Sequence, residues 1–262
     1  MEFLLVFAFL ALFSLSAFAG IVLRKRLHER HLTSETLESV RMMTGLISTF
    51  AALILSLQLS TARTHFDTTT GNRSTYAARL ANLDQCLQAF GEAAEPTRLR
   101  LRQYTAAVIA STWPREAAPV VAGMPDIRGM AVRGEDGSLA RLMGGIGAAV
   151  DTLPAAAGLE HTAARCRAAY ADASAARWNV IEDANAPSGA FFVGILSFWL
   201  SLLFLSFGLQ IPRRALSAAV LAIGVLSVAS VMFVIVDLSL PYQGVFHIPS
   251  AAMREGLADM TR

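Results

Sequence analysis

The 262-residue chain is 54% hydrophobic and only 16% charged, so its apolar content exceeds the globular average of about 45–50%. Its net charge is only +2, and the Lys and Arg side chains do not gather into one large basic face, which argues against nucleic-acid binding. The excess apolar residues form four runs near the two ends, whereas residues 63–183 carry most of the charge.

The first apolar run, residues 3–23, is uncharged and long enough to cross about 30 Å of hydrocarbon as a helix. Basic residues 24–26 follow it. The small residues 17–19 before Gly20 also resemble the cleavage site of a secretory signal peptide. Because Glu2 replaces the usual basic leader and the apolar run continues past Gly20, we expect a retained membrane anchor rather than a cleaved peptide.

The second run, residues 42–62, also lacks charge. Small and weakly polar residues recur in it at every third or fourth position, which places them on one helical face: Gly45, Thr49, Ala52, Ser56 and Ser60. Such a face either packs against another helix in lipid or lines a water-filled path. Thr49, Ser56 and Ser60 are therefore candidate residues of an ion path.

The third and fourth runs, residues 190–211 and 215–236, are separated only by Pro212, Arg213 and Arg214. That spacing leaves room for a tight turn and predicts a helical hairpin. Both runs carry small residues suited to close helix contact: Gly194, Ser197, Ser201, Gly208, Gly224, Ser227 and Ser230.

The sequence thus predicts an all-α membrane protein with four transmembrane helices in two hairpins, at residues 1–62 and 190–236. A helical soluble domain, residues 63–189, is inserted between them, and residues 237–262 form a membrane-surface tail. Basic residues fall in the two short connections: Arg24, Lys25, Arg26, Arg30, Arg41, Arg213 and Arg214. They predict that both connections are cytoplasmic, so the soluble domain would lie in the periplasm, beyond a bacterial inner membrane.

Within the soluble domain, apolar residues of the segment 64–93 have the spacing of one buried helix stripe: Tyr76, Leu80, Leu83, Leu87 and Phe90. Further helices are expected at residues 97–112, 139–153 and 158–183, with a Pro- and Gly-rich loop at 114–138. The arginine run of Arg98, Arg100 and Arg102 is interpreted as a solvated face rather than an anion site.

The only two cysteines, Cys86 and Cys166, fit neither a zinc site nor a CxxC redox motif. Each lies beside or within an apolar helical series, so the two could face each other. A disulfide is chemically allowed if the domain is exported, and two buried free thiols are equally ordinary.

Signs of enzyme chemistry are absent from the sequence. The five histidines are scattered without an HExxH pair, and no GxSxG elbow, P-loop or dinucleotide fingerprint occurs. We therefore expect no catalytic residues, no metal and no cofactor. Asp237 ends the fourth run, either as a plain boundary residue or as the opening of a turn that contains Pro241, Tyr242 and Gly244.

Three stretches resemble a bacterial bestrophin-like family that is catalogued as a domain of unknown function. They are TGLISTFAALILSLQLSTARTHFD, LDQCLQAFGEAAEPTRLRLRQYTAAVIASTWP, and SFWLSLLFLSFGLQIPRR continuing to DLSLPYQGVFHIPSAAMREGL. The family signature after the last span is acidic-x-x-Pro-aromatic-x-Gly. Here it begins at Asp237 and has one extra residue before Pro241, so that the usual Asp-Arg-Pro-Phe core becomes Ser239-Leu240-Pro241-Tyr242.

The resemblance implies a four-helix protomer that assembles, usually as a pentamer, around an anion path lined by the second helix. It also implies a cytosolic large domain, which conflicts with the charge rule. Our first hypothesis is an oligomeric channel for chloride or another small ion, with the lipid bilayer and copies of the same chain as partners. The alternative is a non-conducting scaffold or sensor whose soluble domain binds a partner or ligand.

Overall fold

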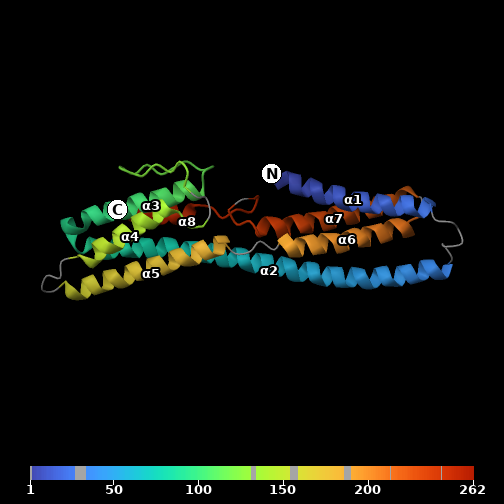
Figure 1. The fold of residues 1–262 in the computed structure, drawn as a ribbon, viewed down its shortest axis with the longest axis horizontal. Helices are drawn as coiled ribbons and strands as arrows, with labels where there is room; N and C mark the ends of the chain where they lie inside the picture. The colour runs from blue at the N-terminus through green and yellow to red at the C-terminus, as the bar shows by residue number, and fades with distance from the viewer. Residues whose placement is uncertain are drawn as a thin grey trace. The chain divides into compact units, whose positions relative to one another are not determined.

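A computed structural model describes residues 2–26, 34–130, 134–153, 159–185, 190–212, 214–242 and 244–262. Within these residues the regular structure is entirely helical (Figure 1). The elements are α1 (Glu2–Arg26), α2 (Ser34–Gln88), the short 3-10 helix η2 (Gly91–Ala94), α3 (Glu95–Thr112), α4 (Gly137–Asp151), α5 (Glu160–Asn185), α6 (Ala190–Gln210), α7 (Ala215–Leu238) and α8 (Ala251–Asp259).

The chain divides into two compact units. We call Met1–Phe66 with Ser188–His247 the apolar unit, and Asp67–Pro187 with Ile248–Arg262 the polar unit. Among the described residues, four helices are long and apolar enough to cross a membrane: α1, α2, α6 and α7. The four apolar runs of the sequence lie on these helices, as predicted.

Helix α2 differs from the sequence prediction. The second span was expected to end at residue 62, with the helical stripe of residues 64–93 belonging to the soluble domain, but the span and residues 64–88 lie on one continuous helix of 55 residues. No proline interrupts it, and Gly71 is accommodated at a modest cost in helix propensity. The boundary between the two units therefore falls inside a helix rather than in a linker.

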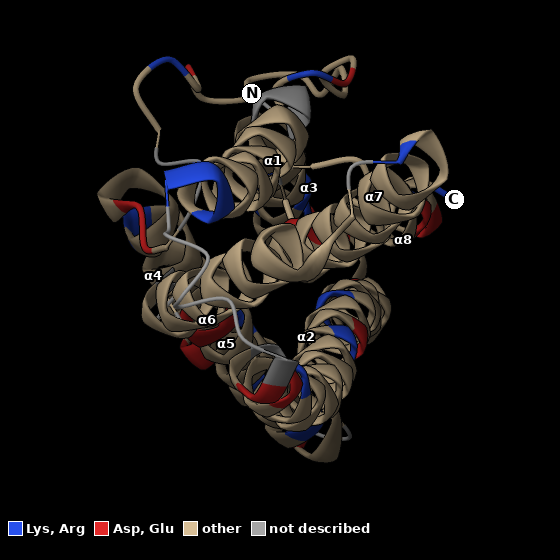
Figure 2. Ribbon diagram, turned by 90° about the vertical axis from the view of Figure 1, so that its right-hand side faces the viewer, with Lys and Arg blue, Asp and Glu red and all other residues tan. Residues whose placement is uncertain are grey.

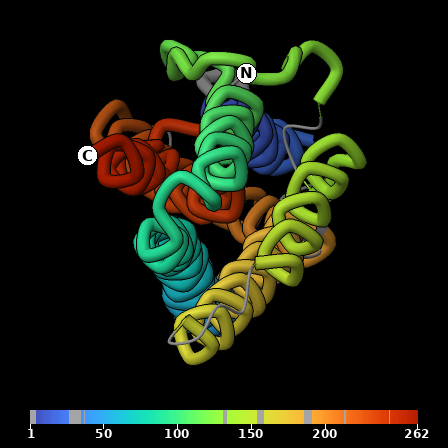
Figure 3. Tube along the Cα trace, turned by 90° about the vertical axis from the view of Figure 1, so that its left-hand side faces the viewer, coloured from blue at the N-terminus to red at the C-terminus, as the bar shows by residue number. Residues whose placement is uncertain are grey.

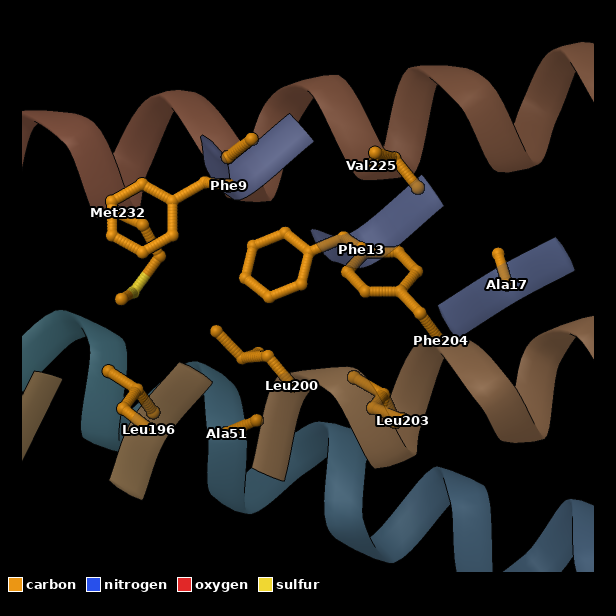
Figure 4. Close-up of a cluster of buried hydrophobic side chains, with 11 residues drawn as sticks. Phe9, Phe13, Ala17, Ala51, Leu196, Leu200, Leu203, Phe204, Val225 and Met232 are labelled. Atoms are coloured by element: carbon orange, nitrogen blue, oxygen red, sulfur yellow. The ribbon is translucent and has the colours of Figure 1, made fainter. Parts of the chain in front are cut away.

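The core of the apolar unit is built from aromatic and aliphatic side chains of α1, α6 and α7, with one small residue from α2 (Figure 4). The rings of Phe13 and Phe204 have centroids 5.3 Å apart, and Phe9 stacks on Phe13. Met232 of α7 is fully buried in the same cluster. Close packing of this kind is what holds helices together in lipid, where there is no hydrophobic drive between them.

Helices α1 and α6 approach closely at two glycines. A Cβ atom on Gly20 would lie 2.1 Å from the carbonyl oxygen of Leu205, and one on Gly208 would lie 2.1 Å from that of Ala17. No side chain fits there, so both positions require glycine. Gly208 was among the residues expected to make close helix contact, whereas nothing fills the space beside Gly194 and Gly224.

The polar unit packs part of α2 with α3, α4, α5 and α8 (Figure 3). The stripe that begins at Tyr76 and ends at Phe90 is buried, as its spacing predicted. The loop between α3 and α4 contains the short irregular segments of residues 113–130, while residues 131–133 lie outside the described part. Asp136 caps α4 by accepting bonds from the backbone N–H groups of Ser138 and Leu139 at 2.8 and 3.1 Å, so residues 137 and 138 are already helical.

The interpretation of the arginine run on α3 was wrong for Arg98. This side chain turns inward and donates two hydrogen bonds of 3.0 Å to the carboxylate of Asp84, which is only 1% exposed. Arg98 and Arg102 also pair with Glu95. Arg98 and Arg102 therefore belong to an ion-pair network with Asp84 and Glu95, whereas Arg100 is exposed, as the interpretation expected.

Candidate functional site

The weakly polar stripe of α2 is exposed along its whole length. Gly45, Thr49, Ala52, Ser56 and Ser60 all face away from the rest of their own chain. Nothing lies within 4 Å of the position of a Cβ atom on Gly45, and the Thr49 hydroxyl donates to the Gly45 carbonyl at 3.1 Å. Within the described residues of the apolar unit, no other helix covers this face.

A different side of α2 faces α6. Ala51 is buried in the core cluster, and Ile47 and Leu55 pack against it. The side-chain amide of Gln210 donates to the Thr44 hydroxyl at 2.8 Å and joins the start of α2 to the end of α6. Farther along, the two helices border an almost wholly apolar groove of about 440 Å³. It is lined by Ile47, Phe50, Ala51, Ile54, Gln58, Phe192, Ile195, Leu196 and Trp199.

Basic residues gather at one end of the apolar unit. Arg24, in the last turn of α1, donates to the carbonyl of Ile211 just after α6. This bond and the contact of Gln210 with Thr44 place the ends of α1 and α6 and the start of α2 at the same end. Figure 2 shows the basic residues at the end of α1. The described basic residues there are Arg24, Lys25, Arg26, Arg41 and Arg214, while Arg30 and Arg213 lie outside the described part.

The loop after α7 is closed by Asp237. Its carboxylate is almost fully buried and accepts bonds from the backbone N–H groups of Val245 at 3.0 Å and Phe246 at 2.8 Å. Gly244 has φ +129°, and a Cβ atom on it would lie 2.5 Å from the Asp237 carboxylate. Asp237 and Gly244 thus act together. The carboxylate accepts hydrogen bonds from two backbone amides, and the absence of a side chain on Gly244 leaves space for the carboxylate.

The other tail residues, Pro241 and Tyr242, are buried in the same loop. The extra residue between Asp237 and Pro241 does not prevent loop closure, because the Asp237 carboxylate still accepts hydrogen bonds from the amides of residues 245 and 246. The geometry gives Asp237 a structural role in this loop.

In the polar unit, Cys86 of α2 and Cys166 of α5 are joined by a disulfide across 80 residues of sequence. Cys166 is fully buried. Beside the bridge lies a more polar groove of about 400 Å³, lined by Asn82, Gln85, Cys86, Arg165, Ala168, Ala169 and Asp172.

A buried polar cluster in the polar unit was missed at the sequence level. The hydroxyls of Tyr76 and Tyr104 are in contact, and Arg177 lies beside Tyr104. All three side chains are buried. The tyrosines were seen only as members of apolar stripes, since helix spacing does not show that two hydroxyls meet. Among the described residues no group of three or more His, Cys, Asp or Glu side chains could hold a metal ion.

Known structures share this architecture. The crystal structure of a point mutant of a bacterial bestrophin homologue from Klebsiella pneumoniae has a TM-score of 0.68 at 15% identity, covering 96% of this chain and 98% of its own. A second crystal structure, described as that of a membrane protein with a point substitution, has a TM-score of 0.70 at 14% identity and 97% coverage of both chains.

At such identities these likenesses show the fold alone. No curated protein sequence matches the chain. The sequence model of the Bestrophin-like domain, however, matches residues 11–253. The chain therefore belongs to the Bestrophin-like domain family.

Proposed function

We propose that the chain forms a homo-oligomeric membrane channel that conducts small ions such as chloride along a path lined by Thr49, Ser56 and Ser60. The observation that carries this proposal is the exposed, uncharged and weakly polar stripe of α2. In a ring of identical chains the same stripe can face a common axis in every copy. Family membership and the likeness to a bestrophin homologue support the same arrangement.

The stripe suits conduction for a physical reason. Hydroxyl groups that face hydrocarbon make no favourable polar interaction with it. Hydroxyl groups that face a pore can replace part of the hydration shell of a passing ion. The stripe carries no charged side chain that would hold an ion tightly. Binding would therefore be weak enough for ions to leave, as conduction requires.

Ion flux from liposomes tests the proposal. Vesicles containing the purified protein should release chloride or another small ion, and Ser56→Trp should block that flux by filling the path. Leu57→Trp is the matched control, since this neighbouring residue is apolar, exposed and outside the stripe. A tight bilayer for every ion and voltage tried would contradict the proposal, as would equal flux in the Ser56→Trp and wild-type vesicles.

We further propose that the polar unit lies in the periplasm of a bacterial inner membrane. Two independent observations support this topology. The basic residues gather at one end of the apolar unit, which favours a cytoplasmic location for that end. A disulfide in the polar unit suits an oxidising compartment. The cytosolic orientation of bestrophins is the competing arrangement.

Alkaline phosphatase fusions test the topology, because this enzyme is active only after export. A fusion in the loop after Pro119 should be active, and a fusion after Arg30 should be inactive. Thiol labelling of denatured protein from whole cells should then find Cys86 and Cys166 blocked until a reductant is added. The reverse fusion pattern, or two freely labelled thiols, would place the polar unit in the cytosol.

A second candidate function is a non-conducting scaffold or sensor whose polar unit binds a partner. It is favoured by the irregular segment between α3 and α4, where Val120 is completely exposed. Crosslinking in native membranes followed by mass analysis separates the two functions. A closed ring of identical chains supports the channel, and a stable complex with a different protein supports the scaffold.

A further inference from the structure

The two sulfurs of the disulfide differ in their access to solvent. Cys166 of α5 is fully buried. Cys86 of α2 is only partly buried, and it lines the polar groove of about 400 Å³. Cys166 is not among the described residues that line this groove. A molecule in the groove therefore lies beside Cys86, and Cys166 lies deeper.

The groove is polar and carries a positive charge. Asn82 and Gln85 of α2 supply amide groups, and Arg165 of α5 supplies a guanidinium group. The carboxylate that lines the groove, that of Asp172, pairs with Arg79 at 3.1 Å, so these two charges offset each other. Among the described lining residues, Arg165 then gives the groove a net positive charge. Pockets of a few hundred Å³ hold small molecules, so the groove suits a small anion.

We propose that Cys86 is a modification site at which a small thiol that carries a carboxylate forms a mixed disulfide. The thiolate of the small molecule attacks the sulfur of Cys86, and a new S–S bond forms between them as the bond from Cys86 to Cys166 breaks. The electron pair of the broken bond goes to the sulfur of Cys166, which takes up a proton from water. The sulfur of the small thiol is oxidised and that of Cys166 is reduced, so the exchange needs no further oxidant or reductant.

Access and charge both direct the exchange to Cys86. The rate of thiol–disulfide exchange depends on which sulfur can be reached, and the groove borders Cys86 alone of the two. The guanidinium of Arg165 attracts a carboxylate and raises the local concentration of an anionic thiol. The amide groups of Asn82 and Gln85 can donate hydrogen bonds to the same carboxylate. The exchange opens the covalent link between α2 and α5.

Two variants that keep one cysteine each test which sulfur reacts. Cys166→Ser and Cys86→Ser both lack the bridge, so any effect of its loss is common to the two. The full-length variants in detergent are incubated with glutathione disulfide, an anionic probe, and the adduct is followed by mass spectrometry. Cys86 should be modified at least about tenfold faster than Cys166, because burial disfavours the thiolate and blocks access. Equal rates would overturn the proposal.

The wild-type protein gives a second measurement that needs no substitution. It is incubated with reduced glutathione, and the free thiols are then alkylated in denaturant. The glutathione adduct should map to the peptide that contains Cys86, and the alkyl group to Cys166. An adduct on Cys166, or no adduct on either cysteine, would contradict the proposal.

Arg165→Gln tests the role of charge in the Cys166→Ser background. It should slow the modification of Cys86 by glutathione disulfide about two- to fivefold, the effect expected of one partly screened charge pair. It should not slow modification by cystamine, a cationic disulfide. Arg167→Gln is the matched control, because this exposed residue lies two positions farther along α5 and outside the groove.

The ratio of the glutathione rate to the cystamine rate decides the outcome. It should fall in Arg165→Gln and stay unchanged in Arg167→Gln. An unchanged ratio in Arg165→Gln, or an equal fall in both variants, would overturn the role of the groove. The flux assay uses none of these residues, so conduction and thiol modification fail separately.

Discussion

Asp237 and Gly244 depend on each other at the scale of single residues. Gly244→Ala would place a methyl group 2.5 Å from the Asp237 carboxylate, at a φ of +129° that side chains rarely adopt. We expect a loss of about 2 kcal/mol or more in unfolding free energy. Thermal unfolding of the detergent-purified protein measures it. Gly224→Ala, which has open space on α7, should change stability little, and equal effects of the two substitutions would contradict this account.

The carboxylate of Asp84 is almost fully buried in its ion pair with Arg98. Asp84→Asn should lower the free energy of unfolding by about 3 kcal/mol, because Arg98 loses its buried counter-charge and keeps only the half-exposed Glu95. Chemical denaturation of the purified protein is the measurement. Asp172→Asn is the control, since its pair with Arg79 at 3.1 Å is about half exposed. That change should cost no more than about 1 kcal/mol. Equal losses of unfolding free energy in the two variants would mean that the ion pair of Asp84 is exposed to solvent.

At the scale of elements, the packing of the apolar unit depends on the close approach of α1 and α6 at Gly20 and Gly208. Gly208→Leu places its Cβ atom 2.1 Å from a backbone oxygen, and no side-chain rotation relieves such a clash. The two helices must separate, so we expect a loss of at least about 3 kcal/mol or failure to accumulate in the membrane. Gly194→Leu, on the same helix with nothing nearby, should be tolerated. A folded Gly208→Leu protein of normal stability would show that the crossing is looser than described.

Glu116 joins helix α8 to the segment after α3 within the polar unit, because its carboxylate accepts hydrogen bonds from Ser250 and Arg254. Burial alone would raise the pKa of Glu116, but hydrogen bonds from Ser250 and Arg254 outweigh it and hold the pKa below its usual value. Since the folded-state pKa is lowered, the carboxylate stabilises the fold above the unfolded-state pKa of 4.5. This contribution is lost as the pH falls below that value and through the folded-state pKa.

Hydrogen exchange along α8 should therefore speed up as the pH is lowered through this range, after correction for the intrinsic pH dependence of exchange. In Glu116→Gln, exchange should already be faster at neutral pH and should show little further dependence on acid. Identical pH profiles for α8 in the two proteins would rule out Glu116 as the group that titrates.

The sequence and the structure agree best where one physical variable decides the outcome. Hydropathy alone located the four apolar helices, because a run of about 20 apolar residues must be removed from water, either in lipid or in a protein core. Helical spacing likewise identified the buried stripe from Tyr76 to Phe90. Both signals are local in the sequence.

Contacts between helices could not be predicted in this way. Gly208 was a candidate for close packing, but its partner Gly20 follows only from the docking of α1 on α6. The meeting of the Tyr76 and Tyr104 hydroxyls and the pairing of Cys86 with Cys166 depend on the rotation of each helix about its axis. Helix α8 could have been found, because Met253, Leu257 and Met260 have helical spacing and are buried.

The central claim at the scale of the whole molecule is that identical chains surround a path lined by α2. A cryo-electron microscopy map of the full-length protein in lipid nanodiscs tests it most directly. We expect a closed ring in which Thr49, Ser56 and Ser60 of every copy face a common, water-filled axis. A monomer, or a ring whose α2 stripes are buried against lipid or against neighbouring helices with no open axis, would contradict the claim.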